Sequence, residues 1–118
     1  MKSLTELREA LRDFAAERDW DQFHSPKNLA IALSVEASEL LEHFQWLTEE
    51  QSRALPPAKA KEVAQELADV LIYLVRLSDK LSIDLLQEAQ RKIAHNSEKY
   101  PADRVRGSSR KYTEWSPR

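Results

Sequence analysis

The sequence predicts an all-α protein, folded as a bundle of four amphipathic helices. Its 118 residues are enough for one domain and too few for a TIM barrel or a full Rossmann fold. One glycine and five prolines provide too few turn residues for a many-stranded β sandwich. Apolar residues recur with the helical period in four segments, and short connectors separate these segments, which is typical of an antiparallel helical bundle.

The first two helices are expected at residues 3–19 and 25–47. Ser3 and Glu6 form a capping box at the start of the first helix, where side chains bind otherwise unpaired amides. Ser25 and Pro26 combine an N-cap residue with a proline at the first helical position. The connector between these helices, residues 20–24, is unusually rich in aromatic residues for a loop.

The third and fourth helices are expected at residues 56–81 and 83–99. Pro56 and Pro57 open the third helix, and Ser82 is expected to cap the fourth. Pro101 ends the fourth helix because proline cannot continue the hydrogen-bond ladder. Residues 48–55 are polar and are expected to hold a single turn.

The third helix is apolar around most of its circumference. One stripe consists of Val63, Leu67, Val70, Leu74 and Leu77, whereas Leu71, Ile72 and Val75 face elsewhere. A monomer of this length has little core in which to bury both faces. We therefore expect a homo-oligomer in which the second face lies between subunits.

Composition and charge exclude several classes of partner and of chemistry. The net charge of −2 generates no global positive field for a nucleic acid polymer. The sequence contains no cysteine, which excludes thiol chemistry and cysteine-ligated metals. It has no long apolar run for a membrane span and no apolar signal-peptide core, so we expect a cytoplasmic protein. Residues 99–118 carry a local charge of +4, against −6 for the remainder, which indicates a basic tail.

Two pairs of acidic residues lie on or beside the predicted core-facing stripes. Glu36 falls about 20° from the centre of the stripe on the second helix, and Glu39 lies one turn further on. Glu66 and Asp69 repeat this i, i+3 spacing at the edge of the stripe on the third helix. Arg76 and Lys80 are expected to reach at most part of this acidic group. Because burying unpaired carboxylates is costly, the pattern predicts a divalent cation, Mg²⁺ or alternatively Mn²⁺.

Two other arrangements of such acids occur in helical proteins. They can simply line the solvated edges of amphipathic helices, which is the usual explanation for a single Glu-x-x-Glu pair. A di-iron carboxylate bundle requires two Glu-x-x-His motifs, and this sequence has none.

The two acidic pairs form the pattern Glu36-x-x-Glu39, a 26-residue gap and Glu66-x-x-Asp69. This pattern resembles the acidic signature of the MazG-like superfamily of all-α nucleoside triphosphate pyrophosphohydrolases. Further segments are similar to its dCTP pyrophosphatase branch, namely FAAERDWDQFHSPKNL, FQW, ELADVLIYLVRL, KYP and RGSSRKYTE. The resemblance covers nearly the whole chain.

The resemblance implies a four-helix bundle of the MazG-like type that assembles as a homo-oligomer, usually a tetramer in this branch. It implies a domain at residues 1–101, a basic tail at residues 102–118, and Mg²⁺-dependent hydrolysis of dCTP or a 5-modified dCTP to the monophosphate and pyrophosphate. The implied metal ligands are Glu36, Glu39, Glu66 and Asp69. The residues implied to contact the base are Trp20, His24 and Trp46, and those implied to contact the sugar and phosphates are Tyr73, Lys92 and Asn96.

The chemistry of these residue types agrees with such a function. Glu36 or Glu39 is expected to orient or deprotonate the attacking water. Lys92 and Asn96, spaced i, i+4, offer a cation and an amide to phosphate oxygens. Aromatic rings provide surfaces on which a base stacks, and residues 106–111 of the tail could close over the phosphates.

Two alternatives remain open at this stage. One is a non-enzymatic helical assembly module, in which the acids are solvated and the aromatic residues pack against a partner. The other is the same hydrolysis with a different base preference, such as dUTP or a damaged purine.

Overall fold

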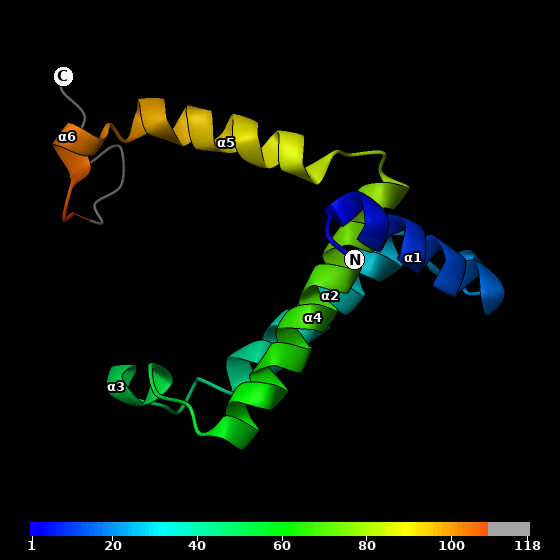
Figure 1. Ribbon diagram of the computed structural model, residues 1–118, viewed down its shortest axis with the longest axis horizontal. Helices are drawn as coiled ribbons and strands as arrows, with labels where there is room; N and C mark the ends of the chain where they lie inside the picture. The colour runs from blue at the N-terminus through cyan, green and yellow to red at the C-terminus, as the bar shows by residue number, and fades with distance from the viewer. Residues whose placement is uncertain (109–118) are drawn as a thin grey trace. The chain divides into compact units, whose positions relative to one another are not determined.

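The computed structural model describes residues 1–108 as helices joined by short connectors, and no strand occurs among them (Figure 1). These residues belong to two compact units, one comprising Met1–Ile83 and the other beginning at Asp84. The all-α prediction is confirmed for the described part of the chain. The first unit contains α1 (Leu4–Glu17), a 3₁₀ turn η1 (Asp21–Phe23), α2 (Pro26–Glu42), α3 (Glu49–Ser52) and α4 (Pro57–Lys80). The second contains α5 (Leu85–Lys99) and α6 (Ala102–Val105).

Two of the four predicted helix starts are confirmed by side-chain caps. Ser3 accepts a hydrogen bond from the Glu6 amide, but the Glu6 carboxylate accepts from the Lys2 amide, so only half of the predicted capping box forms. Ser25 accepts a hydrogen bond from the Asn28 amide, with Pro26 at the start of α2. The expected single turn after α2 is α3, which Thr48 and Gln51 open with a reciprocal capping box. Local sequence therefore determines where these helices begin.

The cap assigned to Ser82 is wrong. Asp84 accepts a hydrogen bond from the Gln87 amide and is the N-cap of α5. Ser82 instead has a φ of 56° and lies just past the end of α4. The Ile83 amide donates to the Ser78 carbonyl, and the Ser82 amide donates to the Asp79 carbonyl. This pair of bonds is a Schellman motif, which uses the left-handed residue to terminate a helix.

α1 ends in the same way, two residues earlier than predicted. Asp19 has a φ of 52°, and the Trp20 amide donates back to the Ala15 carbonyl at 2.9 Å. The Trp20 ring meets Phe14 edge-on, with ring centroids 5.7 Å apart. Such an apolar contact commonly accompanies the Schellman motif, so the end of α1 determines the place of Trp20.

α2 ends at Glu42, five residues earlier than predicted. The amides of Phe44 and Leu47 bond to carbonyls three residues back, and residues 43–46 form turns. The apolar spacing that extends to Leu47 therefore continues into tightened turns rather than an α-helix.

α4 packs against both α2 and α1, and these contacts define the first unit. Among residues 1–108, four apolar residues are buried, namely Ala15, Leu29, Val63 and Val75. On α4, Leu67 and Leu74 of the predicted core-facing stripe and Leu71 of the second face are exposed, whereas Val75 of the second face is buried. The predicted division into a covered stripe and an uncovered second face is therefore partly wrong, because packing within one chain buries residues of both faces.

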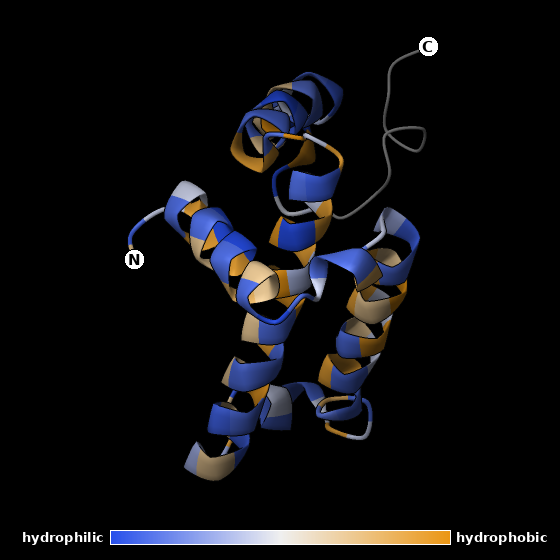
Figure 2. Cartoon of the chain, turned by 90° about the vertical axis from the view of Figure 1, so that its right-hand side faces the viewer, coloured by the Kyte–Doolittle hydropathy of each residue, from blue (hydrophilic) through white to orange (hydrophobic). Residues whose placement is uncertain are grey.

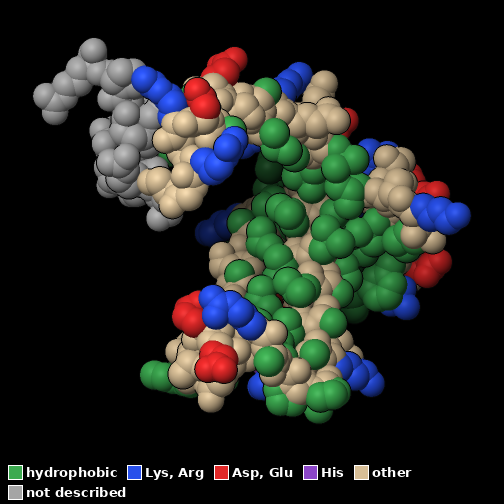
Figure 3. All heavy atoms as spheres, turned by 60° about the vertical axis from the view of Figure 1, so that its left-hand side comes forward, with side chains coloured by type: hydrophobic (Ala, Val, Ile, Leu, Met, Phe, Trp, Pro, Cys, Tyr) green, Lys and Arg blue, Asp and Glu red, His purple; other side chains and the backbone are tan. Residues whose placement is uncertain are grey.

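Apolar and polar residues alternate along the helices (Figure 2). Hydrophobic side chains gather across the face of the first unit that Figure 3 turns to the viewer. None of the helices in residues 1–108 has the length and apolar character needed to cross a lipid bilayer.

Candidate metal and nucleotide site

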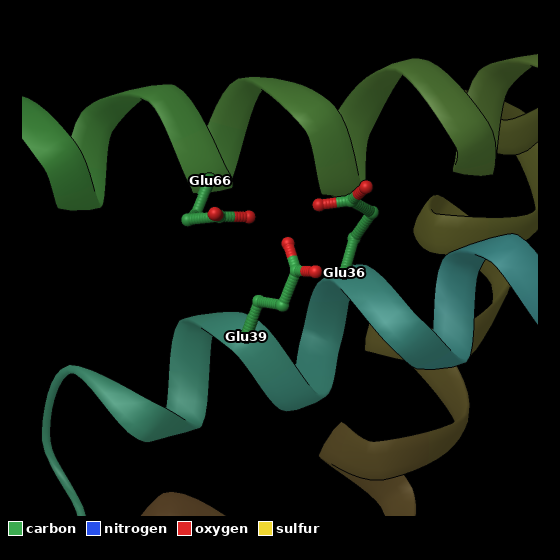
Figure 4. Close-up of side chains that lie close together, drawn as sticks. All are labelled: Glu36, Glu39 and Glu66. Carbon is green, nitrogen blue, oxygen red and sulfur yellow. The ribbon is translucent and has the colours of Figure 1, made fainter.

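Three glutamates from two helices converge between α2 and α4. Glu36 and Glu39 project from α2 and Glu66 from α4, and their carboxylates point toward one another (Figure 4). One oxygen from each residue lies within 4.8 Å of the others. All three side chains are half-buried. The helical spacing that placed these acids near apolar stripes therefore brings them together in space.

Two oxygens of this cluster are buried without a hydrogen-bond partner, one on Glu36 and one on Glu66. The pKa of Glu36 is raised to about 7, mainly by burial. Hydrogen bonding with Glu66 and Glu39 and the charges of Glu39 and Asp69 supply the rest of this shift. Unpaired buried acceptors and mutually repelling carboxylates are what a bound cation would relieve. The all-oxygen donor set fits a hard divalent ion such as Mg²⁺ or Mn²⁺.

Asp69 lies one turn beyond Glu66 on α4 and is also half-buried. Its charge acts on Glu36, although its oxygens are not part of the three-carboxylate group. The structure thus places the fourth predicted ligand beside the cluster.

The two cations considered as partners for these acids have other partners. Lys80 pairs with Asp21 of η1. Arg76 pairs with Asp21 at 2.5 Å and with Asp79 at 3.7 Å. The positive charges of Arg76 and Lys80 are therefore paired with carboxylates near the C-terminal end of α4, away from the three glutamates.

The connector between α1 and α2 holds two of the residues predicted to contact a base. Trp20 is partly exposed beside Phe14, and His24 is half-buried. His24 Nδ1 lies 3.1 Å from Arg76 Nε of α4. Burial, followed by the charge of Arg76, lowers the pKa of His24, so its imidazole is neutral at neutral pH.

The other predicted site residues lie in three places. Tyr73 is half-buried on α4, one turn from Asp69 and one turn from Arg76. Trp46 lies in the turns after α2 and is 86% exposed. Lys92 and Asn96 are exposed on one face of α5, in the second unit. The part of the tail from residue 109 on, including the second half of the segment expected to close over phosphates (residues 106–111), lies outside the described residues.

Sequence reasoning missed the link between Arg76 and His24. The two residues are 52 positions apart, and only the packing of α4 against the rest of the first unit brings them together. A signal was present, because Arg76 continues the face of α4 that carries Glu66, Asp69 and Tyr73.

Taken together, the all-helical fold and the carboxylate cluster on α2 and α4 define a helical protein with a candidate divalent-metal site. A family model described as the MazG-like family matches residues 31–115, which include all four predicted metal ligands. This chain belongs to the MazG-like family.

Individual relatives are also similar over most of the chain. It is 46% identical to dCTP pyrophosphatase 1 from Mus musculus over 114 residues, covering 95% of this chain and 67% of that protein. The protein of the same name from Homo sapiens is 45% identical with the same coverage. Among solved structures, a pyrophosphatase from Archaeoglobus fulgidus DSM 4304 is similar with a TM-score of 0.78 and 42% identity, covering 82% of this chain and 91% of that one.

Proposed function

We propose that this chain hydrolyses dCTP, or a 5-modified dCTP, to the monophosphate and pyrophosphate, and so removes unwanted nucleotides from the pool. One observation carries the proposal. A cluster of three carboxylates with two unpartnered buried oxygens occurs in a MazG-like chain whose relatives are named dCTP pyrophosphatase 1. A non-enzymatic assembly module would have no need to concentrate costly negative charge in one place.

In this proposal Glu36, Glu39, Glu66 and Asp69 hold Mg²⁺, with Mn²⁺ as the alternative ion. The bound ion supplies charge neutralisation for the triphosphate and lowers the pKa of a coordinated water. The carboxylates alone would repel a polyanionic substrate, so they can take part in binding it only when a cation balances their negative charge.

The protein's own groups supply the remaining chemistry. Glu36 or Glu39 orients the attacking water and accepts its proton. The proposed base contacts come from Trp20, His24 and Trp46, with flat rings that suit stacking. Tyr73, Lys92 and Asn96 are assigned to the sugar and phosphates, where a cation and polar donors fit the oxygen acceptors.

The proposal extends to the organisation of the protein. Residues 1–101 form the hydrolase domain and residues 102–118 a basic tail. The protein works as a homo-oligomer, a tetramer, in the cytoplasm. The partly exposed leucines of α4 support association, because large apolar side chains left in contact with water favour burial between subunits.

The test is pyrophosphate release from a panel of nucleoside triphosphates with and without Mg²⁺. We expect Mg²⁺-dependent release, with dCTP or a 5-modified dCTP used most efficiently. A preference for dUTP or a damaged purine would retain the reaction and change the substrate. No release from any nucleotide, together with no effect of Mg²⁺ plus nucleotide on thermal stability, would favour the assembly module.

A further inference from the structure

Arg76 is a charged residue in the interior of the first unit. This residue of α4 is 5% exposed, and the proposed reaction gives it no role. A buried guanidinium is tolerated only when its donors are satisfied by well-placed acceptors. Arg76 Nη2 donates to Asp21 Oδ1 at 2.5 Å, and Arg76 Nε donates to His24 Nδ1 at 3.1 Å.

The bond to His24 determines the protonation of that imidazole. The guanidinium is always charged and can only donate, so Nδ1 of His24 must accept and cannot carry a proton. A neutral imidazole with a bare Nδ1 carries its single proton on Nε2. The contact with Arg76 therefore selects the tautomer in which Nε2 is a hydrogen-bond donor.

The guanidinium is itself held in place from several sides. Asp21 accepts from Arg76 and from Lys80, which connects η1 to the last turns of α4. Asp79 pairs with Arg76 and accepts two hydrogen bonds from Arg12 of α1, one of them at 2.7 Å. The charged groups that act on His24 are Asp21, Arg76 and Lys80. Their ion pairs link the connector between α1 and α2 to α4.

This network lies on the same face of α4 as the acids. Glu66, Asp69, Tyr73 and Arg76 follow one another at steps of three or four residues. Ten residues of α-helix separate Glu66 from Arg76, which corresponds to about 15 Å along the axis. His24 therefore lies near the end of α4 that a nucleotide would reach if its phosphates bind at the carboxylates and its base extends along this helix.

We infer that Arg76 is a positioning residue that fixes His24 as the neutral Nε2–H tautomer and so presents a hydrogen-bond donor to the nucleobase. The role toward the base rests on the proposed function. Cytosine offers the ring nitrogen N3 and the carbonyl O2 as acceptors, so a fixed donor complements its pairing edge. Uracil carries a proton on N3 and loses one of these acceptors.

The first test is spectroscopic and needs no activity. Protein labelled with ¹⁵N is examined by NMR at pH 8, where the His24 resonances are assigned with the help of His24→Ala. We expect His24 to show a protonated Nε2 and an unprotonated Nδ1, with a scalar coupling from Arg76 Nε to His24 Nδ1 across the hydrogen bond. A protonated Nδ1 in the wild-type protein would overturn the inference.

The second test uses Arg76→Lys, which keeps the charge near Asp21 and Asp79 but removes the Nε donor. Losing one hydrogen bond of this kind is expected to raise the KM for dCTP roughly fivefold, with kcat nearly unchanged. Arg53→Lys is the matched control, because Arg53 is exposed and pairs with Glu49 in α3. We expect the kinetics of this control to equal those of the wild type.

A double-mutant cycle shows whether Arg76 acts through His24. If it does, Arg76→Lys raises KM in the wild-type background and has little effect on KM in the His24→Ala background. Equal effects in both backgrounds would overturn the positioning role. If wild-type protein hydrolyses no nucleotide, the proposed function fails, and the NMR measurement still decides whether Arg76 fixes the tautomer.

Discussion

Replacing Glu36 with glutamine is expected to stabilise the metal-free protein and to abolish its activity. Glutamine has nearly the same shape as glutamate but carries no charge, so it relieves the repulsion within the carboxylate cluster. The substitution also removes a proposed metal ligand. Stability and activity should therefore change in opposite directions.

The size of the stabilisation can be estimated from the pKa of Glu36. Burial and the neighbouring carboxylates raise this pKa from 4.5 to about 7. At about 1.4 kcal/mol per pH unit, the ionised side chain costs the fold at most about 3.5 kcal/mol. Solvent screening at a half-buried site reduces this cost, so we expect a gain of about 1–3 kcal/mol in the variant. For a chain of this size that is roughly 4–12 °C in melting temperature.

The pH dependence has a definite sign. The folded pKa of Glu36 exceeds the unfolded value, so the cost is absent below pH 4.5 and complete above about pH 7. The difference in melting temperature between Glu36→Gln and wild type should therefore be small at pH 4.5 and largest at pH 8. A general packing effect of the substitution would not follow this profile.

The assay is thermal melting with EDTA at fixed protein concentration, followed by repeated melts with Mg²⁺ and with Mg²⁺ plus dCTP. We expect ligand to raise the melting temperature of the wild type but not of Glu36→Gln. Turnover of dCTP should fall by a factor on the order of 100 to 1,000. Glu42→Gln is the control, because Glu42 is exposed at the end of the same helix.

Two results would refute the reasoning. If Glu36→Gln melts lower than wild type at pH 8 in EDTA, the glutamate is stabilising and the cluster is not a site of repulsion. If the variant retains wild-type turnover, Glu36 is neither a metal ligand nor a base. A matching loss in Glu42→Gln would show that the effect is not specific to the cluster.

Three further predictions follow from particular contacts. Binding of Mg²⁺, measured by calorimetry, should weaken as the pH falls below about 7, because the ion then competes with a proton on Glu36; affinity that is constant from pH 8 to 5.5 would contradict this. The hydrogen bonds from Arg12 lower the pKa of Asp79, so they stabilise the fold at neutral pH, and this contribution is lost as acid protonates Asp79. Arg12→Gln should therefore destabilise the protein more at pH 7 than at pH 3, measured by denaturant titration. An equal loss of stability at both pH values would contradict this prediction. Leu29 is 1% exposed between the helices, so Leu29→Ala should cost about 2–5 kcal/mol of unfolding free energy in urea titrations; a cost below about 1 kcal/mol would show that the site collapses or is not core.

Short-range features of this protein were determined by the sequence alone. Ser3, Ser25 and Pro26 mark helix starts because caps act between residues a few positions apart. The i, i+3 spacing of Glu36 and Glu39 places both acids on one side of α2 because the helix has a fixed period. These signals were sufficient for the all-α class and for the acids of the candidate metal site.

Helix ends depended on finer geometry than the apolar pattern records. Ser82 has the side chain of a good N-cap, yet its left-handed backbone ends α4, and Asp84 caps α5. The pattern that ran on to Leu47 did not distinguish an α-helix from turns with tighter hydrogen bonds. In both cases, two local hydrogen-bonding arrangements of similar energy compete for the same residues.

Only the tertiary structure decided how distant residues meet. The packing of α4 against α2 brings Glu66 up to Glu36, leaves an oxygen of each without a partner, and raises the pKa of Glu36. The same packing places Arg76 against His24 and so selects the proton position on a residue 52 positions away. The helical period determines which side of its own helix a residue occupies. The burial of that residue and the protonation state of its side chain depend on the groups that the neighbouring helix places opposite it.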